Sequence, residues 1–358
     1  RRFRRMMTRF ATSGKSRHVR GFSFVVMATA LAACGPTQPE WTTLKGNAQG
    51  TTFTITYLDS AQRDLSAQVD SLFRVIDRSL SLWDSTSTIT HFNAAADTVV
   101  TSDRHFQVVL ALSRQQWSTT EGAFDPTVLP LVRAWGLGKK GKAELDTTAV
   151  DSLMHCVGMP RIRIPDSWER PNATAPLTFQ KASPCVQFDP NGIAQGYTVD
   201  MLALLLRQRG MERFMVEVGG EVRTSGLNAR DGEWTIQIDK PLVGDAHEQQ
   251  IVVPLRDRAL ATSGNYRKFI EIGGKRYGHT IDPRTGRPAM NALLSASVIA
   301  DDCATADALG TALMVMGPEA AKLWLLRHRE VEAYLIVDDG QGGFISWQTP
   351  DWPERSAQ

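Results

Sequence analysis

The chain has 358 residues, with 40 lysines and arginines against 38 aspartates and glutamates, which gives a formal net charge of +2. Hydrophobic residues make up 42% of the sequence and charged residues 22%, proportions that are typical of globular proteins. This composition excludes a mainly disordered chain, a collagen-like repeat and a long coiled coil. The length is compatible with two domains or with one large domain.

The basic residues are concentrated at the N-terminus. Residues 1–33 contain eight lysines and arginines and no acidic residue, and they end in an apolar run from Gly21 to Ala33. A positive segment followed by about 7–15 apolar residues is typical of a secretory signal peptide, and this run is shorter than the ~20 residues that span a bilayer. We therefore expect residues 1–33 to be removed on export. The remainder then has 32 lysines and arginines against 38 acidic residues, a net charge of −6.

The end of this segment, Leu31-Ala32-Ala33-Cys34, resembles the lipobox of bacterial lipoproteins. The resemblance implies that Cys34 is lipidated, and that the protein is anchored to the inner membrane and faces the periplasm. Residues 34–45 would then form a short tether, and residues 46–350 the folded domain. The alternatives are a plain signal peptide with a chance cysteine and, more weakly, a twin-arginine signal at Arg4-Arg5.

Three further cysteines, Cys156, Cys185 and Cys303, belong to the expected mature chain. The motifs Cys-x-x-Cys and His-Glu-x-x-His do not occur, so structural zinc and zinc-protease chemistry have no support. In an oxidising compartment Cys156 and Cys185 can pair and leave Cys303 free, but the sequence does not decide this pairing.

Strands and helices are predicted in a mixed order along the chain. Alternation of β-branched and aromatic residues predicts a strand over 51–58, and apolar residues at helical spacing predict helices over 61–80 and 105–119. The proline-rich stretch 160–184 is expected to be poor in strands. The second half predicts strands over 214–218, 221–225, 234–238, 251–255, 268–272, 276–281, 294–300, 331–337 and 343–347, and helices over 196–209, 304–316 and 318–328. Because βαβ alternation is lacking, an α+β fold is predicted, with mixed sheets packed against helices.

The segment Asp-Pro-Asn-Gly-Ile-Ala-Gln-Gly-Tyr at 189–197 leads into a predicted helix. Glycines at 192 and 196 allow the backbone to approach a phosphate at a helix N-terminus. A tight turn capped by Asp189 is the structural alternative.

Asp307 and Thr311 are four residues apart in a predicted helix, so their side chains share one face. Carboxylate and hydroxyl oxygens are hard ligands that suit Mg²⁺. The alternative is an ordinary helix start, where the helix dipole favours Asp307. His279 ends a predicted hairpin just before an Asp-Pro turn, where a side chain can face a cleft, although a lone histidine is more often structural.

Four motifs together resemble the FAD:protein FMN transferases of the ApbE family, and they occur in the order found in that family. They are Asp-x-x-Gly-Ile-Ala-x-Gly-Tyr at 189–197, Ala-Thr-Ser-Gly at 261–264, His-x-Ile-Asp-Pro-x-Thr-Gly at 279–286, and Thr-Ala-Asp-x-Leu-x-Thr at 305–311. The resemblance implies an ApbE-like fold and a Mg²⁺-dependent reaction. In this reaction FMN moves from FAD onto a Thr or Ser hydroxyl of a partner protein, and AMP is released.

The resemblance also implies a role for individual residues. The metal would lie between Asp307, Thr311 and the Gly192 carbonyl, and His279 would receive the proton of the acceptor hydroxyl. Contacts with the flavin nucleotide are implied for Gln49, Trp83, Ala123, Phe124, Asp125, Asp189, Gln195 and Ile281. The acceptor is expected to be a subunit of a membrane redox complex.

Two residues depart from the family pattern, because the family often has Lys in place of Gln195 and Met in place of Gln49. Loss of the lysine removes a positive charge from the diphosphate region. Two other functions fit the same residues: an FAD pyrophosphatase that releases FMN and AMP, and a lipid-anchored flavin-binding protein without turnover. Nucleic-acid binding is not supported, because no basic patch occurs outside the N-terminal segment.

Overall fold

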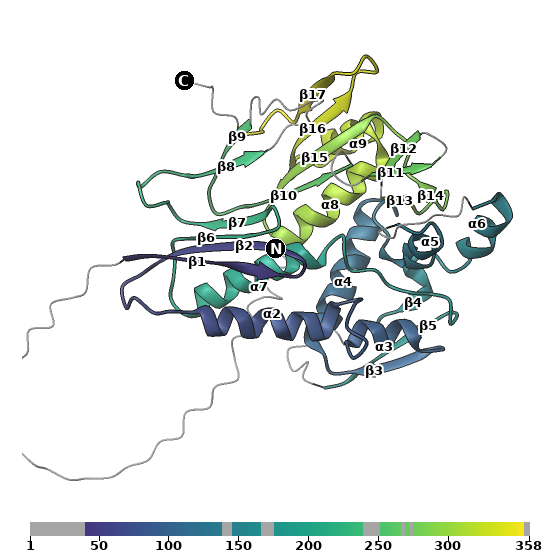
Figure 1. The fold of residues 1–358 in the computed structure, drawn as a ribbon, viewed down its shortest axis with the longest axis horizontal. Helices are drawn as coiled ribbons and strands as arrows, with labels where there is room; N and C mark the ends of the chain where they lie inside the picture. The colour runs from purple at the N-terminus through teal and green to yellow at the C-terminus, as the bar shows by residue number, and fades with distance from the viewer. Residues whose placement is uncertain are drawn as a thin grey trace, which may run out of the picture.

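The computed structural model describes residues 40–137, 145–165, 175–238, 251–265, 269–272, 275–278 and 280–353 (Figure 1). The expected signal peptide with Cys34 and the predicted catalytic residue His279 lie outside these described residues. No helix in the described part of the chain is both long and apolar enough to cross a membrane.

An antiparallel sheet of eight strands is the central element of the fold (Figure 1). Its strands pair in the order β1-β2-β6-β7-β10-β15-β16-β17, so the N-terminal hairpin is at one edge and the C-terminal strand at the other. The strands are β1 (Glu40–Ala48), β2 (Thr51–Asp59), β6 (Phe214–Val218), β7 (Glu221–Ser225), β10 (Ala259–Gly264), β15 (Leu293–Ala300), β16 (Glu332–Asp338) and β17 (Phe344–Gln348).

Apolar layers cover both faces of this sheet. On one face, α7 (Ala194–Gln208) packs against β6 and β7, and α8 (Cys303–Met316) packs against β10 and β15. Helices α2 (Ser66–Leu80) and α9 (Pro318–Arg327) extend this layer. On the other face, the hairpin of β8 (Trp234–Ile238) and β9 (Ile251–Leu255) packs on apolar side chains of β7, β10, β15 and β16. This double cover explains why every residue of β7 is buried.

A second group of elements packs beside the sheet around α4 (Arg104–Thr119). The Phe106 ring of α4 is fully buried and contacts the rings of Phe92, Phe179 and Phe188. The other members are α3 (Thr88–Ala94), α5 (Leu129–Ala134), α6 (Thr147–Met154), β3 (Thr98–Thr101), β4 (Ile162–Arg163), β5 (Leu177–Lys181), and the short 3₁₀ helices η2 (Pro126–Val128) and η3 (Met159–Arg161).

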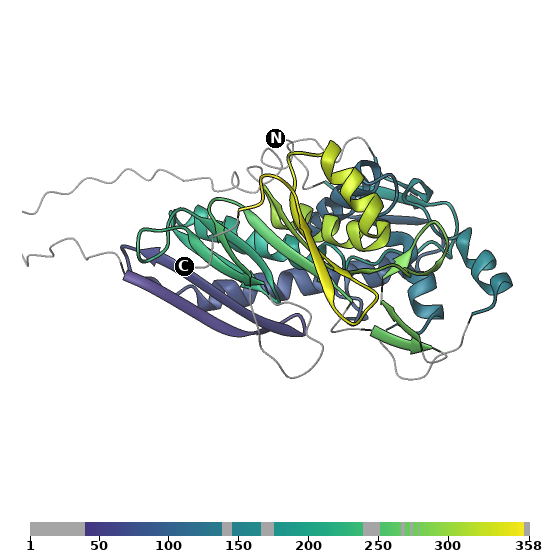
Figure 2. The ribbon, with the colours of Figure 1, turned by 90° about the horizontal axis from the view of Figure 1, so that it is seen from above.

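The short strands β11 (Phe269–Ile272), β12 (Lys275–Gly278), β13 (Ile281–Asp282) and β14 (Arg287–Pro288) complete the described elements. Figure 2 shows α5 and α6 at the end of the molecule opposite the β1–β2 hairpin.

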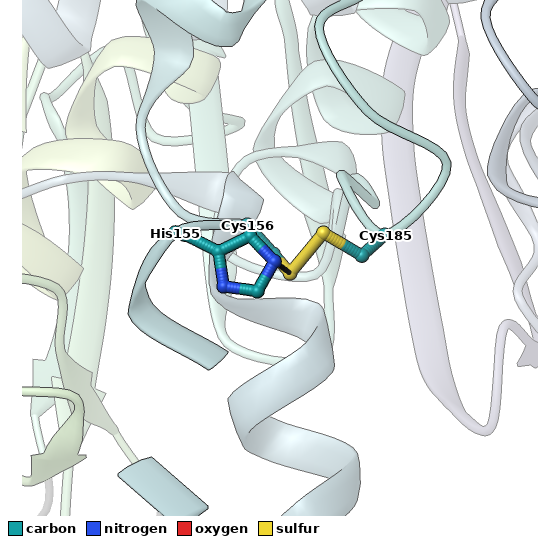
Figure 3. A group of neighbouring side chains, drawn as sticks. All are labelled: His155, Cys156 and Cys185. Atoms are coloured by element: carbon teal, nitrogen blue, oxygen red, sulfur yellow. Dashed lines mark hydrogen bonds between the residues drawn. A yellow bond between two sulfur atoms is a disulfide. The ribbon is translucent and has the colours of Figure 1, made fainter. Parts of the chain in front are cut away.

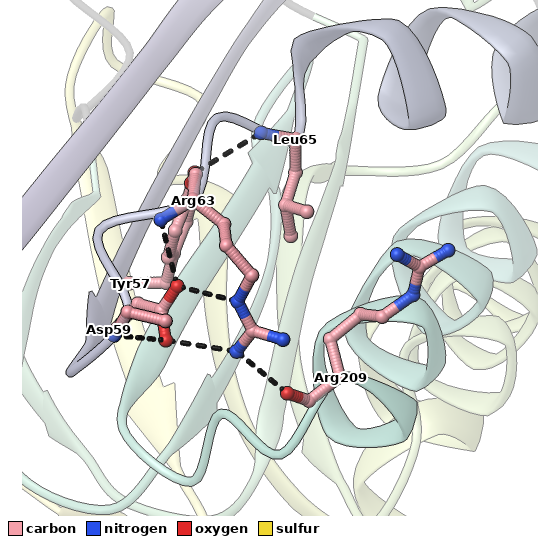
Figure 4. Close-up of polar contacts among 6 residues, drawn as sticks. Tyr57, Asp59, Arg63, Leu65 and Arg209 are labelled. Atoms are coloured by element: carbon pink, nitrogen blue, oxygen red, sulfur yellow. Dashed lines mark hydrogen bonds and ion pairs between the residues drawn. The ribbon is translucent and has the colours of Figure 1, made fainter. Parts of the chain in front are cut away.

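A group of hydrogen bonds around Arg63 connects the end of β2 to the end of α7 (Figure 4). Arg63 donates two hydrogen bonds of 2.8 Å to the carboxylate of Asp59 and a third to the Arg209 carbonyl. Tyr57 donates its hydroxyl proton to the Arg63 carbonyl at 2.7 Å. The Arg63 guanidinium holds the pKa of Asp59 well below its usual range, so this carboxylate stays ionised at neutral pH.

The predicted α+β class is confirmed, and the predicted strands at β6, β7, β8 and β9 have the observed bounds. Three local predictions were wrong. The helix predicted over 61–80 begins at Ser66, because the preceding residues form the turn around Asp59. Strand β1 begins at Glu40, within the stretch 34–45 expected to be a tether. The proline-rich stretch contains β4 and β5, which pair with each other and, through β5, with β3.

Candidate functional site

A cavity of about 550 Å³ lies where the helical group meets the sheet. This volume is within the range of ~300–1,000 Å³ that is usual for small-molecule sites. Its walls come from the start of α7, from α8, from the ends of β7 and β10, from β8, and from the segment leading into α5. Nine predicted site residues line it: Ala123, Phe124, Asp125, Asp189, Gly192, Gln195, Ile281, Asp307 and Thr311.

The three predicted metal-binding residues are brought together at one corner of the cavity, called the metal corner below. Asp307 and Thr311 project from α8, as their spacing predicts. Gly192 lies so close to the Thr311 side chain that a Cβ atom at position 192 would be 3.1 Å from Thr311 Oγ1. The backbone amide of Gly196 donates to Asp307 Oδ2 at 3.0 Å, which fixes the carboxylate at the start of α7.

The donor set of the metal corner fits a hard divalent cation. Asp307 is 6% exposed, and burial raises its pKa to about 7 despite the hydrogen bond from Gly196. Among the described residues, no ion pair joins Asp307 to a lysine or arginine. A buried carboxylate without a cationic side chain, one helical turn from a hydroxyl in the same cavity wall, offers the oxygen ligands that Mg²⁺ prefers.

Two further carboxylates, Asp125 and Asp189, lie in another part of the cavity wall. Asp125 accepts hydrogen bonds from the Thr127 amide and hydroxyl at 2.8 and 2.5 Å, and from the Met159 amide at 3.2 Å. Asp189 accepts one from the Asn191 amide at 2.9 Å. Burial raises the pKa of Asp125, and it raises the pKa of Asp189 to about 6. Both groups are therefore placed to interact with polar hydrogens or a cation of a bound ligand.

Gln195 lines the cavity, but its amide group is already engaged. Its Nε2 donates to the Val218 carbonyl at 2.9 Å, at the end of β6. The neighbouring Gly219 has φ +61°, and a Cβ atom there would lie 1.8 Å from Gln195 Nε2. A glycine at 219 is therefore required by the close approach of this side chain as well as by the turn.

Gln49 and Trp83 are not among the residues that line the cavity. Gln49 lies in the β1–β2 turn with φ 51°, and its side chain donates to Asp77 Oδ1 on α2 at 3.1 Å. The Trp83 side chain is 82% exposed. Thr51, two residues after Gln49, does line the cavity, so the turn approaches its rim.

Sequence reasoning assigned no role to several residues of the cavity wall. They include Glu221 after the Gly219-Gly220 turn, Thr262 and Ser263 on β10, and Gln237 on β8. Thr262 and Ser263 belong to the Ala-Thr-Ser-Gly motif, but periodicity does not reveal which way such side chains point. No comparable local signal marks Gln237.

A second cluster of ligand-type side chains, His155, Cys156 and Cys185, is shown in Figure 3. Cys156 and Cys185 form a disulfide, which settles the pairing that the sequence left open, and Cys303 is a buried free thiol. Because the two sulfurs are bonded to each other, they are not available as thiolate ligands in this form.

Substitution Gly196→Ala should disrupt the metal corner. A Cβ atom at 196 would lie 2.3 Å from the Cys303 carbonyl oxygen and 2.8 Å from Asp307 Cβ, so α7 and α8 must separate. We expect a loss of about 2 kcal/mol or more in unfolding free energy, because the close approach of the two helices is lost. Urea unfolding measures this effect. Gly232→Ala is the control, because the nearest atom there is 3.7 Å away; equal stability of the two variants would contradict the packing argument.

Substitution Asp189→Asn should stabilise the metal-free protein at neutral pH. The pKa of Asp189 is about 6 in the folded chain, against about 4 in an unfolded chain, so its ionisation lowers stability as pH rises from 4 to 7. We expect the variant to be more stable by about 2 kcal/mol at pH 7.5 and equal to the wild type at pH 4. Urea unfolding at both pH values measures this, with the exposed Asp70→Asn on α2 as control. A difference that is the same at both pH values would contradict it.

Comparisons with known proteins agree with this geometry. The sequence model of the ApbE family matches residues 49–335. An FAD:protein FMN transferase of Vibrio cholerae is 35% identical over 328 residues, which cover 88% of this chain and 94% of the relative. One of Haemophilus influenzae is 32% identical over 333 residues, which cover 90% and 94%.

Solved structures confirm the expected ApbE-like fold. The flavin transferase ApbE of Vibrio cholerae superposes with a TM-score of 0.75 at 31% identity, covering 87% of this chain and 98% of that one. The apo form of the Pseudomonas stutzeri flavinyl transferase ApbE gives 0.77 at 30% identity, covering 87% and 96%. With a family match over most of its length and relatives above 30% identity, this chain belongs to the ApbE family.

Proposed function

We propose that this chain transfers FMN from FAD to a Thr or Ser hydroxyl of a partner protein, in a Mg²⁺-dependent reaction that releases AMP. Its curated relatives are FAD:protein FMN transferases, which supports the transferase activity. The observation that carries the proposal is the metal corner. Asp307, Thr311 and Gly192 lie in the same cavity as the residues expected to contact the flavin nucleotide.

The charge of the cavity supports a requirement for a cation. Four carboxylates line it, those of Asp125, Asp189, Glu221 and Asp307, and the described lining residues include no lysine or arginine. A dinucleotide with a diphosphate group would be repelled by this surface. A bound Mg²⁺ would offset the repulsion and stabilise the negative charge that develops on the AMP leaving group.

We assign metal binding and proton transfer to the following residues of the chain. The Asp307 carboxylate, the Thr311 hydroxyl and the Gly192 carbonyl would hold the cation. His279 would accept the proton of the acceptor hydroxyl as its oxygen attacks the phosphorus of the FMN phosphate, and the bond from that phosphorus to the AMP oxygen would break. A histidine suits this proton transfer because its ordinary pKa lies near neutral pH.

Asp307→Ala and His279→Ala test the assignment. Incubation with FAD, Mg²⁺ and an acceptor that carries the target hydroxyl should give a covalently flavinylated acceptor, detected by mass spectrometry. Each substitution should lower the rate by roughly 100-fold or more, because it removes a metal ligand or the general base. Asp70→Ala, on an exposed face of α2, should leave the rate unchanged.

The same assay distinguishes the other functions. Free FMN and AMP formed at an equal rate with or without acceptor would indicate an FAD pyrophosphatase. Bound FAD without any product would indicate a flavin-binding protein. Either result would overturn the transferase proposal.

We also propose that Cys34 is lipidated, that the protein faces the periplasm from the inner membrane, and that its acceptor is a subunit of a membrane redox complex. The apolar run before Leu31-Ala32-Ala33-Cys34 supports this proposal. Mass spectrometry of the mature protein should find a lipidated Cys34 as the first residue, and Cys34→Ala should move the protein out of the membrane fraction. An unmodified N-terminus at another residue would refute the anchor.

A further inference from the structure

The Cys156–Cys185 disulfide, drawn in Figure 3, is not among the residues that line the cavity, but hydrogen bonds connect its surroundings to the cavity wall. Its two cysteines are 29 residues apart in the sequence. Cys156 lies two residues after the end of α6 and is 1% exposed. Cys185 is partly exposed and precedes Asp189, a residue of the cavity wall, by four positions. The disulfide thus joins a segment that leads to the cavity wall at Asp189 to one that is hydrogen-bonded to the cavity residue Asp125.

On the Cys156 side, the chain binds the side chains of Asp125 and Thr127. The Gly158 amide donates to Thr127 Oγ1 at 2.6 Å, and the Met159 amide donates to Asp125 Oδ2 at 3.2 Å. Thr127 is fully buried, and its hydroxyl donates to Asp125 Oδ1 at 2.5 Å. One carboxylate oxygen of Asp125 is therefore held directly by Met159, three positions after Cys156, and the other by Thr127, whose hydroxyl accepts from Gly158.

On the Cys185 side, the chain leads to Asp189. Val186 and Phe188 are fully buried, which anchors this short segment in the core. The Asp189 amide then donates to the Pro126 carbonyl at 2.7 Å, directly beside Asp125. Hydrogen bonds, backbone and the disulfide therefore form a closed ring, which fixes the position of Asp125 relative to Asp189.

The metal corner is held by other contacts. Asp307 is fixed by the Gly196 amide, and the N-terminal amides of α8 donate to Asp200 on α7. None of these hydrogen bonds passes through the disulfide ring. Opening the ring is therefore expected to disturb Asp125 and Asp189 and to leave Asp307 and Thr311 of α8 in place.

We propose that the Cys156–Cys185 disulfide and Thr127 position Asp125 and Asp189 for binding of the FAD dinucleotide, so that reduction of the disulfide weakens FAD binding. This inference rests on the proposed function in taking FAD as the ligand. Reduction by a dithiol reagent transfers two electrons and two protons to the cysteine sulfurs, and the reagent becomes a cyclic disulfide. The partial exposure of Cys185 gives the reagent access, and the free thiol of Cys303 is fully buried.

The test compares FAD binding and turnover in variants of the ring. In Cys156→Ser/Cys185→Ser, we expect the Kd of FAD, measured by flavin fluorescence with Mg²⁺ and without acceptor, to rise about tenfold. The KM for FAD should rise equally, whereas kcat should change less than twofold. Dithiothreitol should produce the same increase in the wild type and no further change in the double variant.

Thr127→Val provides an independent test in a protein that keeps the disulfide. It removes the hydroxyl that links Gly158 to Asp125, so the Kd of FAD should again rise about tenfold, and Thr127→Ser should restore it. The effects of Thr127→Val and of the two serine substitutions should be less than additive, because they act on one ring. If the double variant does not fold, Thr127→Val and Thr127→Ser decide the question.

Val216→Ala is the control for a general loss of stability that does not involve the disulfide. Val216 is fully buried in the core between α7 and the sheet. The substitution should lower the unfolding midpoint without changing the Kd of FAD. An unchanged Kd in both Thr127→Val and the double variant would overturn the positioning role while leaving the proposed transferase intact. Wild-type protein that fails to bind FAD at all would overturn both.

Discussion

The first turns of α7 and α8 lie in backbone contact at Gly196, and the arrangement of the site depends on this contact. A side chain at 196 would overlap the Cys303 carbonyl, so only glycine allows the two helices to approach this closely. Asp200, one turn further along α7, accepts hydrogen bonds from the Cys303 and Ala304 amides at 3.0 and 2.9 Å. These are free N-terminal amides of α8, where the helix dipole favours a carboxylate. Arg223 of β7 forms a buried ion pair with Asp200, which joins both helices to the sheet.

Burial of carboxylates is the second constraint on the site. Burial raises the pKa of Asp307, and it raises the pKa of Asp189 despite the nearby charge of Arg133. Ionisation of these buried acids lowers the stability of the folded chain, and a bound divalent cation would offset this cost. The metal proposed above would therefore act on the same buried carboxylates whose pKa values are raised.

Much of the local structure could be predicted from the sequence, because it depends on residues close together in the chain. The spacing of Asp307 and Thr311 placed both on one helix face, and β6 to β9 have the predicted bounds. The four ordered motifs alone are enough to indicate the ApbE family, which the family match over residues 49–335 confirms. Local patterns failed where a side chain interrupts them, as at the Asp59 turn, which delays the start of α2.

The sequence by itself determined the fold class, most of the elements and the chemical types of the site residues. Only the tertiary structure decided which of them meet. Gly192 lies beside Thr311, and Cys156 pairs with Cys185, although in each case the two residues are far apart in the chain. It also placed Glu221 in the cavity wall and the exposed Trp83 outside it. The physical reason is that periodicity and turn chemistry act over a few residues, whereas the proximity of distant segments is decided by how whole helices and sheets pack.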